Sequence, residues 1–302
     1  MTPRYEKTTR ESELAIEESV MQTMALKTTN INKHFGGGFD ARRLLPWCSP
    51  PEEKSAHVLR DISIEAQKGE VFGLIGANGS GKSTLVRILS TLLLPDSGSC
   101  EIFGYDVVTE AGKVRALINR VSADPSFFRN MSPYENLLFF GRVYGLGSEE
   151  IKRKVPDILE RLGFETDKIN EPMSHLSRGQ QQKVAVARSF LTSPVLMLLD
   201  EPTTGLDPRS KRDVQRFIQQ VQRDHDATIL LTTHDMEEAE TLCDRISFIA
   251  GGKIVAVGTP LELKERVGNG NAENTSMDDV FMALTGKDIA EDEVMHELAL
   301  NG

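Results

Sequence analysis

Three short apolar runs recur along the chain at positions that suit buried strands. They are VFGLIG at 71–76, PVLMLLD at 194–200 and ATILLTTHD at 227–235. Nearly continuous apolar runs of this length are typical of parallel strands that are covered on both faces. Helical segments alternate with these runs. The pattern therefore predicts a layered α/β domain built on a mostly parallel sheet.

Other parts of the chain have a different pattern. A strand is expected from about Met24 in ALKTTNINKHF, as an N-terminal antiparallel β part, and short strands with a turn are expected in 245–267. Between about 126 and 190, segments such as SPYENLLFFGRVYG and SEEIKRKVPDILERLG are helical in pattern. That block predicts a helical subdomain inserted into the α/β core.

The remaining segments break the periodicity. Residues 1–23 are expected to form a mobile arm, and residues 286–302 an acidic C-terminal tail. Residues 36–57 contain three glycines and three prolines, which predicts an exposed loop. Its RRLLPW could contact a membrane or a partner, but a surface insertion is the simpler interpretation. The main domain is expected over 24–285.

Composition limits the class of protein. The chain has 302 residues, of which 39% are hydrophobic and 26% charged, as in ordinary globular proteins. No basic N-terminal region precedes an apolar run, so no signal peptide is expected, and no apolar stretch approaches the roughly 18 residues that span a bilayer. Three separated cysteines, Cys48, Cys100 and Cys243, fit a reducing cytoplasm. The net charge of −10 argues against a surface that binds nucleic acid, although it does not exclude a local basic groove.

The segment GANGSGKST, at 76–84, follows an apolar run and precedes a helical pattern. Its glycines let the backbone bend around phosphate oxygens, Lys82 supplies a positive charge, and Ser83 offers a hydroxyl to Mg²⁺. A plain glycine-rich turn is the alternative, which the spacing and context make improbable. The predicted phosphate-binding residues are Gly76, Asn78, Gly79, Ser80, Gly81, Lys82, Ser83 and Thr84.

Two acids and a histidine end the other apolar runs. Asp200 ends one strand, where ligands of parallel sheets gather, and could hold Mg²⁺. The adjacent Glu201 is suited to polarise an attacking water. His234 ends another strand, and it could hydrogen-bond the γ-phosphate or the water. A structural histidine and a solvated strand end are the alternatives.

The segment LSRGQQQKV, at 176–184, predicts a helix that Ser177 caps. Glycine and glutamines stand where a helix start usually has acids. Such a start suits an anion, because the helix N-terminus carries partial positive charge. An ordinary capped surface helix is the alternative from this stretch alone.

In order, these motifs resemble the ATP-binding subunit of ABC transporters, over roughly 24 to 285. GANGSGKST matches Walker A, and MLLDEP, at 197–202, matches Walker B with its catalytic glutamate. GLDP, with Asp207, matches the D-loop, TTH matches the switch histidine, and LSRGQ is similar to the signature LSGGQ. The fold implied is that of P-loop NTPases.

The resemblance implies several roles. ATP and Mg²⁺ are the expected cofactors. Phe35 would stack on the adenine ring; the alternative is that Phe35 is a buried aromatic at the end of a strand. Ser177, Gly179 and Gln180 would approach ATP on a second ATPase chain, so a homodimer is expected. Arg178, which stands where the family has a glycine, would either point away from the nucleotide or add a charge beside it.

The resemblance also implies a place of action. A separate membrane-spanning permease is expected as partner, with this chain peripheral at the cytoplasmic face. ADPSFFRNMSPYENLLFFGRVYGL and TSMDDVFMALTG resemble the bacterial branch that exports drugs, polysaccharides or lipids. A soluble ABC-type ATPase acting on ribosomes or DNA is the alternative, and a non-hydrolysing regulatory module is a third. The transported substrate is not encoded in this sequence.

One family residue is missing. Aligning the segment 118–137 with the family places Ala123 where a glutamine usually contacts magnesium and water. Asp124 or Ser122 could substitute, since either could take a Mg²⁺-bound water. This departure concerns metal coordination and coupling to the membrane partner rather than ATP binding.

Overall fold

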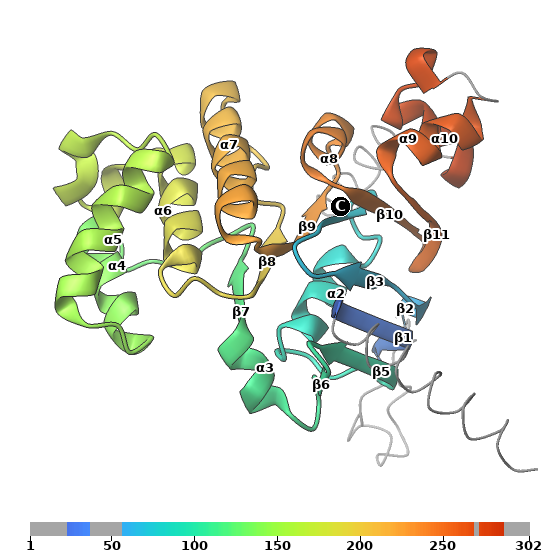
Figure 1. Cartoon of the computed structure of the whole chain (residues 1–302), viewed down its shortest axis with the longest axis horizontal. Coiled ribbons are helices and arrows are strands. Elements are labelled where there is room, and N and C mark those ends of the chain that lie inside the picture. The colour runs from blue at the N-terminus through green and yellow to red at the C-terminus, as the bar shows by residue number, and fades with distance from the viewer. Residues whose placement is uncertain (1–22, 37–55, 269–271, 287–302) are drawn as a thin grey trace, which may run out of the picture.

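The structure is a computed structural model that describes residues 23–36, 56–268 and 272–286 (Figure 1). The predicted N-terminal arm, most of the predicted 36–57 loop and almost all of the acidic tail lie outside the described residues. Within the described ranges, two sheets and a group of helices make up the molecule.

A mostly parallel sheet forms the centre of the molecule. Its order among the described strands is β11-β10-β4-β9-β8-β7, and only the β10–β11 pair is antiparallel. Its strands are β4 (Val71–Ile75), β7 (Ile118–Val121), β8 (Leu196–Asp200), β9 (Thr228–Thr233), β10 (Arg245–Ala250) and β11 (Lys253–Gly258). Every residue of β4, β8 and β9 is buried, as the continuous apolar runs predict.

A second, antiparallel sheet lies over one face of the first. It has the order β2-β1-β5-β6, and β3 also pairs with β1. Its strands are β1 (Met24–Phe35), β2 (Ala56–Ile62), β3 (Glu65–Gln67), β5 (Ser97–Ile102) and β6 (Tyr105–Asp106). The predicted combination of a mostly parallel sheet and an N-terminal antiparallel part is confirmed.

Two hydrophobic clusters cover the two faces of the parallel sheet. Alternation along β4 sends Phe72 and Leu74 to one cluster and Val71 and Ile75 to the other. Helix α2 (Lys82–Leu89) lies in the first cluster, together with side chains of the antiparallel sheet. The face with α2 is therefore enclosed between the two sheets, and this helix follows directly from the predicted phosphate loop.

Helices fill much of the predicted helical block and form one end of the molecule (Figure 1). They are α4 (Pro133–Val143), α5 (Ser148–Arg161) and α6 (Arg178–Phe190), with 3₁₀ turns at Thr166–Asn170 and Met173–His175. Capping boxes start α4 at Ser132 and α6 at Ser177. The division of the chain into a core and an inserted subdomain stays a prediction.

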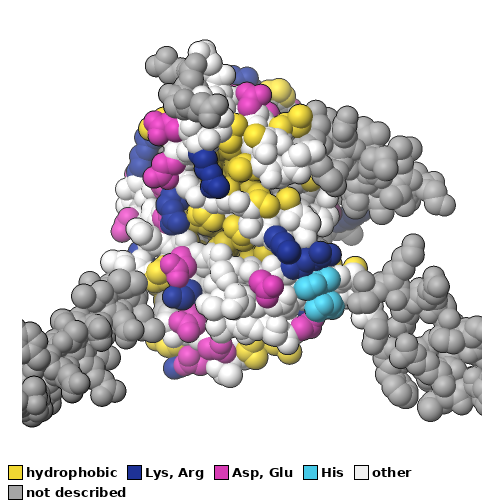
Figure 2. Space-filling model, turned by 90° about the vertical axis from the view of Figure 1, so that its right-hand side faces the viewer, with side chains coloured by type: hydrophobic (Ala, Val, Ile, Leu, Met, Phe, Trp, Pro, Cys, Tyr) yellow, Lys and Arg dark blue, Asp and Glu magenta, His cyan; other side chains and the backbone are white. Residues whose placement is uncertain are grey.

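The remaining helices are α3 (Ala111–Leu117), α7 (Pro208–His225), α8 (Met236–Leu242), α9 (Pro260–Val267), a 3₁₀ turn at Ala272–Asn274 and α10 (Met277–Thr285). Helices α9 and α10 lie at the end of the molecule opposite α4 and α5 (Figure 1). Seen from that side, acidic and basic side chains are interspersed around a central area of hydrophobic ones (Figure 2).

Candidate active site

The predicted phosphate loop connects β4 to α2 through a tightly curled backbone. Gly79 and Gly81 have φ values of 77° and 111°, which side chains other than glycine rarely adopt. A Cβ atom on Gly76 would lie 2.3 Å from the carbonyl oxygen of Ile249 in β10. The loop therefore needs glycine at these positions in order to turn beside the sheet.

Lys82 is buried in this loop. Its Nζ donates hydrogen bonds to the carbonyl oxygens of Gly76 (2.7 Å) and Ala77 (3.1 Å). The Ser80 hydroxyl is buried nearby, and its oxygen has no hydrogen-bond partner among the described residues. Helix α2 has no side-chain cap and no acid in its first turn. A buried ammonium, an unsatisfied hydroxyl and an uncapped helix start together fit a phosphate group.

Asp200 lies at the end of β8 and contacts three other elements. Its Oδ1 accepts hydrogen bonds from the hydroxyls of Ser83 (3.0 Å) and Thr232 (2.9 Å), and Arg120 Nη2 lies 3.4 Å from its Oδ2. The structure thus brings together the two predicted metal-binding residues, Asp200 and Ser83. Sequence reasoning missed Thr232, which lies near the end of a predicted strand, and Arg120, which lies in β7, where no strand was predicted.

Glu201 has a left-handed backbone, with φ of 50°. Its amide donates to the Thr232 carbonyl oxygen (3.0 Å) and hydroxyl (3.1 Å), which anchors the turn. Its Oε1 lies 3.4 Å from Lys82 Nζ, and its Oε2 lies 3.4 Å from His234 Nδ1 and accepts from the Thr204 hydroxyl at 3.1 Å. The predicted Glu201 and His234 therefore meet at one edge of the sheet.

The charge of Glu201 follows from these neighbours. Burial raises the pKa of its carboxyl, but His234, Lys82 and Thr204 outweigh burial and lower that pKa from 4.5 to about 2. Glu201 is therefore a carboxylate at neutral pH, and in this arrangement it binds a proton weakly.

The predicted signature residues begin α6. The Ser177 hydroxyl accepts from the Gln180 amide (3.3 Å), and Gln180 Oε1 accepts from the Ser177 amide (3.0 Å). A Cβ on Gly179 would lie 2.6 Å from Ser210 Oγ in α7 and 3.1 Å from Asp207 Oδ2. Gly179 therefore allows α6 to approach the start of α7 closely.

The predicted D-loop leads into α7. Asp207 caps that helix by accepting from the amides of Arg209 and Ser210, both at 3.0 Å. Arg178 is exposed, and a Cβ on Gly205 would lie 2.9 Å from its Nη1. The Arg178 side chain thus extends along the D-loop of its own chain.

The other predicted residues are an aromatic at the end of β1 and three residues that follow β7. Phe35 ends β1 and is 41% exposed, with Lys33 Nζ 5.8 Å from its ring centroid, so the alternative of a buried aromatic is wrong. Ser122, Ala123 and Asp124 follow directly after β7, which pairs in parallel with β8. They therefore leave the sheet at the same edge as Asp200, with Asp124 exposed.

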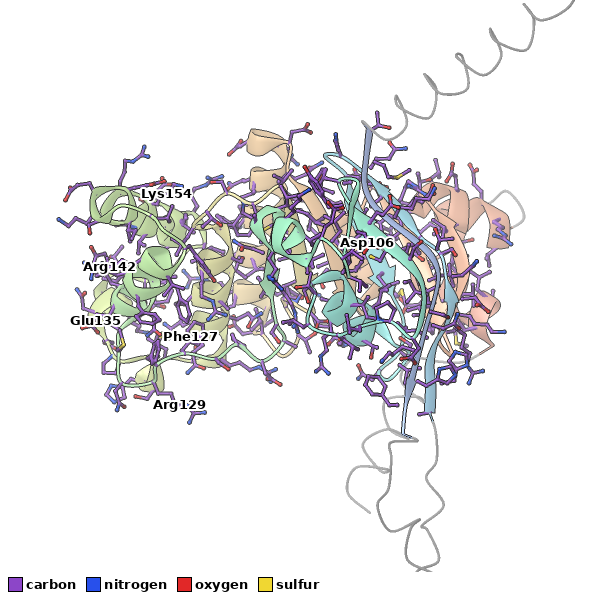
Figure 3. The ribbon with its side chains drawn as sticks, turned by 90° about the horizontal axis from the view of Figure 1, so that it is seen from below. Asp106, Phe127, Arg129, Glu135, Arg142 and Lys154 are labelled. Carbon is purple, nitrogen blue, oxygen red and sulfur yellow. The ribbon has the colours of Figure 1, made fainter. Side chains whose placement is uncertain are left out.

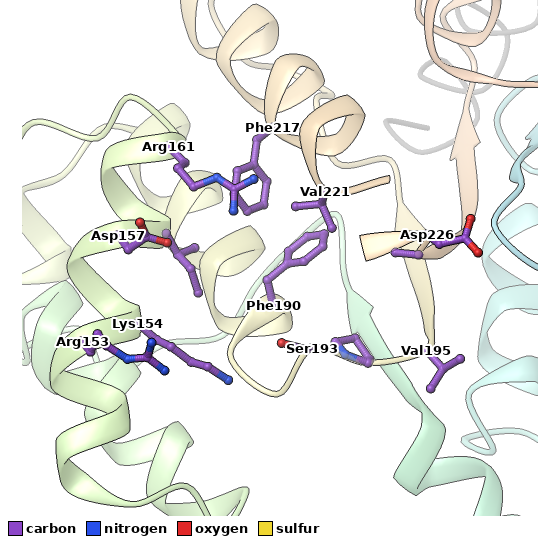
Figure 4. A pocket seen from close by; sticks show the side chains of 13 residues that line it. Arg153, Lys154, Asp157, Arg161, Phe190, Ser193, Val195, Phe217, Val221 and Asp226 are labelled. Carbon is purple, nitrogen blue, oxygen red and sulfur yellow. The ribbon is translucent and has the colours of Figure 1, made fainter. Parts of the chain in front are cut away.

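A cavity of about 640 Å³ lies elsewhere, among α5, α6 and α7 (Figure 4). Its lining includes Arg153, Lys154 and Arg161 of α5, and Phe190 and Phe217 on the other side. It adjoins Val195 and Ala227, which precede β8 and β9, whereas the predicted site lies where these strands end. None of the predicted site residues lines this cavity.

Taken together, a glycine loop before a helix, a buried lysine, and an acid pair at the end of β8, two strands away in the same parallel sheet, define a P-loop NTPase. The family model for ABC transporters matches residues 59–204. The chain is 38% identical over 215 residues to the ABC transporter ATP-binding protein NatA of Bacillus subtilis strain 168, covering 71% of this chain and 87% of that one. The chain belongs to the ABC transporter ATP-binding family.

Two further relatives and a solved structure agree. The doxorubicin resistance ATP-binding protein DrrA of Mycobacterium tuberculosis H37Rv is 38% identical, over 77% of this chain and 71% of that one. The Nod factor export ATP-binding protein I of Neorhizobium galegae is 38% identical, over 70% of this chain and 60% of that one. The solved structure of an ABC transporter ATP-binding subunit superposes on this one with a TM-score of 0.70 and 27% sequence identity. The match covers 86% of this chain and 99% of that one.

These comparisons confirm the predicted family, the fold and the ATPase class. The roles of individual site residues stay predictions. None of the helices in the described ranges is long and apolar enough to cross a membrane.

Proposed function

We propose that this chain is the ATP-hydrolysing motor of an ABC exporter and drives a separate membrane-spanning permease. The observation that carries the hydrolytic part is the position of Glu201, whose carboxylate lies 3.4 Å from both Lys82 and His234. The exporter part rests on similarity to proteins whose names state drug resistance and Nod factor export.

ATP would bind with its phosphates in the loop at 76–84. Lys82 then exchanges its bonds to Gly76 and Ala77 for phosphate oxygens, and the Ser80 hydroxyl gains the partner that it lacks. Phe35 is exposed at the end of β1, where a purine ring could stack on it. In each case a part of ATP, either a phosphate oxygen or the purine ring, would contact a polar or aromatic side chain that can accept a further partner.

Ser83 and Asp200 would hold Mg²⁺. A serine hydroxyl and a carboxylate are oxygen ligands, which this hard cation prefers, and the two lie 3.0 Å apart. Within the described residues, no group of three or more His, Cys, Asp or Glu could hold a metal ion, so phosphate oxygens and water would complete the shell. The bound metal would neutralise charge that develops on the phosphates.

Glu201 would orient and polarise the attacking water. Its low pKa makes it a weak base in the nucleotide-free arrangement. When phosphates draw the Lys82 ammonium toward themselves, the carboxylate loses one of the positive charges that lower its pKa. Nucleotide binding would thus strengthen the base, and His234 and Thr204 would keep the carboxylate in position.

Replacing Glu201 with glutamine tests this role. The Glu201→Gln variant keeps the shape of the side chain and should still bind ATP, while turnover falls by about 10²-fold or more, the range of a positioned base. Phosphate release and ATP binding by calorimetry are the measurements. Glu237→Gln, which removes an exposed acid of α8, is the matched control and should keep turnover. Near-normal hydrolysis by Glu201→Gln would exclude the role.

Exposed hydrophobic side chains on α4 and in the segments before and after it support a protein partner. We call Phe128, Phe139, Val143 and Tyr144 the aromatic surface; all four are exposed, Val143 by 63%. Rings of Phe128 and Phe139 meet edge to face, with centroids 4.9 Å apart. Exposed apolar groups that adjoin one another typically mark an interface.

The aromatic surface is connected to the nucleotide site through the segment after β7. Phe127, in that segment, and Arg142, on α4, are labelled at the helical end of the molecule in Figure 3. Arg188 of α6 lies over the rings of Phe127 (5.2 Å) and Phe140 (4.7 Å) and donates to the Ser126 carbonyl oxygen at 2.9 Å. A permease bound to this surface could sense movements of β7 and α6.

A charge placed on this surface tests the permease interface. Phe139→Asp combined with Val143→Asp should abolish co-purification with a membrane protein from detergent, because a buried charge without a partner is costly. Leu94→Asp, at an equally exposed leucine outside this surface, is the control and should co-purify normally. Retention of the membrane partner by the double variant contradicts this interface, and capture of only soluble partners contradicts the motor role.

A further inference from the structure

Arg120 is a basic residue of β7 that points to the face of the sheet occupied by α2. Ile118, two residues earlier, packs in the same hydrophobic cluster as Leu85 and Ile88 of α2. Side chains two apart on a strand share a face. Arg120 lies opposite Leu198 in the β7–β8 register, so its side chain can extend toward Asp200, which shares a face with Leu198.

The contacts of Arg120 are few and long. Its Nη2 lies 3.4 Å from Asp200 Oδ2 and 3.4 Å from the Ser122 hydroxyl. Its Nε is buried and has no hydrogen-bond partner among the described residues. A guanidinium can donate five hydrogen bonds, so this one is poorly satisfied. A side chain that only stabilised the fold would be expected to have better partners.

The same guanidinium lies beside the second carboxylate oxygen of Asp200. Both carboxylate oxygens are engaged, since Oδ1 accepts from Ser83 and Thr232 and Oδ2 faces Arg120. A cation that uses Asp200 must therefore displace or share these donors. Arginine keeps its positive charge at every accessible pH, so its repulsion of a second cation is permanent.

We infer that Arg120 is a specificity-determining residue that competes with the divalent cation for Asp200. This inference rests on the proposed Mg²⁺–ATP site. With Arg120 in place, Asp200 is neutralised and holds free metal weakly. Phosphates add the negative charge that lets the guanidinium move off Oδ2, so the metal enters with the nucleotide. Ala123, which has no side-chain oxygen, cannot offset this competition.

Metal binding itself, rather than turnover, tests the competition. Mn²⁺ is the probe, titrated against the Glu201→Gln full-length chain with ATP and followed by electron paramagnetic resonance. Arg120→Gln and Arg120→Met should each tighten Mn²⁺ binding by at least about threefold, since removing the guanidinium from this largely buried ion pair frees a carboxylate oxygen. Arg120→Lys keeps the charge and should stay within about twofold of the parent.

The control removes the same charge elsewhere. Arg115 of α3 has a long contact, 3.4 Å, to the Thr91 hydroxyl, and Arg115→Gln should leave Mn²⁺ affinity unchanged. If one neutral variant of Arg120 fails to fold by circular dichroism, the other carries the test. Unchanged or weaker Mn²⁺ binding in the folded neutral variants overturns the inference, as does equal tightening by Arg120→Lys.

The proposed function fails in a different way. If calorimetry finds no ATP binding to the parent or to any variant, the nucleotide site itself is wrong, and the inference falls with it. If all variants bind ATP and only the expected differences in Mn²⁺ affinity are missing, the nucleotide site stands and the role of Arg120 alone is rejected.

Discussion

The phosphate loop and the signature helix are both helix starts, yet they differ in how far their own chain completes them. Lys82 and Asp200 are each only 3% exposed and have partners from the loop and neighbouring strands of the same chain. Ser177 is exposed, and its capping partner is Gln180 of the same helix. One region is an assembled site, and the other is an outward-facing surface.

This difference indicates what each region lacks. The charges and hydroxyls around the phosphate loop already converge within one chain. The signature helix has an N-terminus without an acid in the first turn, so it can accept an anion from outside the chain. We propose that two copies related by a twofold axis associate so that the signature of each copy lies at the phosphate loop of the other.

Among substitutions that test this difference within a single chain, the largest effect is expected for Gly179→Ala, and it is an effect on stability. Gly179→Ala would bring a Cβ to 2.6 Å from Ser210 Oγ and 3.0 Å from Ser210 Cβ, so the Ser210 side chain must rotate or α6 and α7 must move apart. We expect a loss of about 1–3 kcal/mol in the free energy of unfolding, measured by urea denaturation. The result would show that this signature glycine has a packing role inside the chain in addition to any role across an interface.

Gly112 provides the matched control, because a Cβ there would meet nothing within 4 Å. Gly112→Ala, in α3, should be neutral or stabilising by up to about 1 kcal/mol. Equal stability of the two variants would contradict the packing role of Gly179. Its role would then be confined to the outward-facing surface.

A smaller effect is expected beside the phosphate loop, after β7. Ala123→Gln adds an amide oxygen at the sheet edge where Asp200 lies, and it should lower the Mg²⁺ concentration for half-maximal ATPase. Asp124→Ala should raise that concentration if Asp124 substitutes for the missing glutamine. A change of a few-fold is expected, about the size of one exposed charge contact.

The two outcomes separate distinct explanations. No change in either variant would mean that this segment does not contact the metal. A loss only in Asp124→Ala would mean that the metal contact is shifted by one residue along the segment.

The assembled region could largely be predicted from the sequence, because its signals are local. The buried strands are continuous apolar runs, and Gly76, Lys82 and Ser83 lie at a spacing that few other structures need. Asp200 and Glu201 follow a buried strand directly, and parallel strands end at one edge of the sheet. These residues therefore lie together at the sheet edge that the shared direction of parallel strands predicts.

Contacts that depend on strand neighbours could not be predicted. Arg120 meets Asp200 because β7 pairs with β8 in a particular register, which no local pattern encodes. Gly179 packs on α7 because of the way two helices approach each other. Thr232 contacts Asp200 from β9, although its position in an apolar run suggested only burial.

The central claim is that two chains complete each ATP site, and light scattering of the Glu201→Gln chain with saturating ATP tests it most directly. A dimer has twice the mass of the 33.5 kDa chain. We predict that this dimer forms only with ATP and that adding Ser177→Arg, a bulky cation at the signature cap, abolishes it while ATP binding is kept. A monomer under saturating ATP, or a dimer that persists with Ser177→Arg, would contradict the claim.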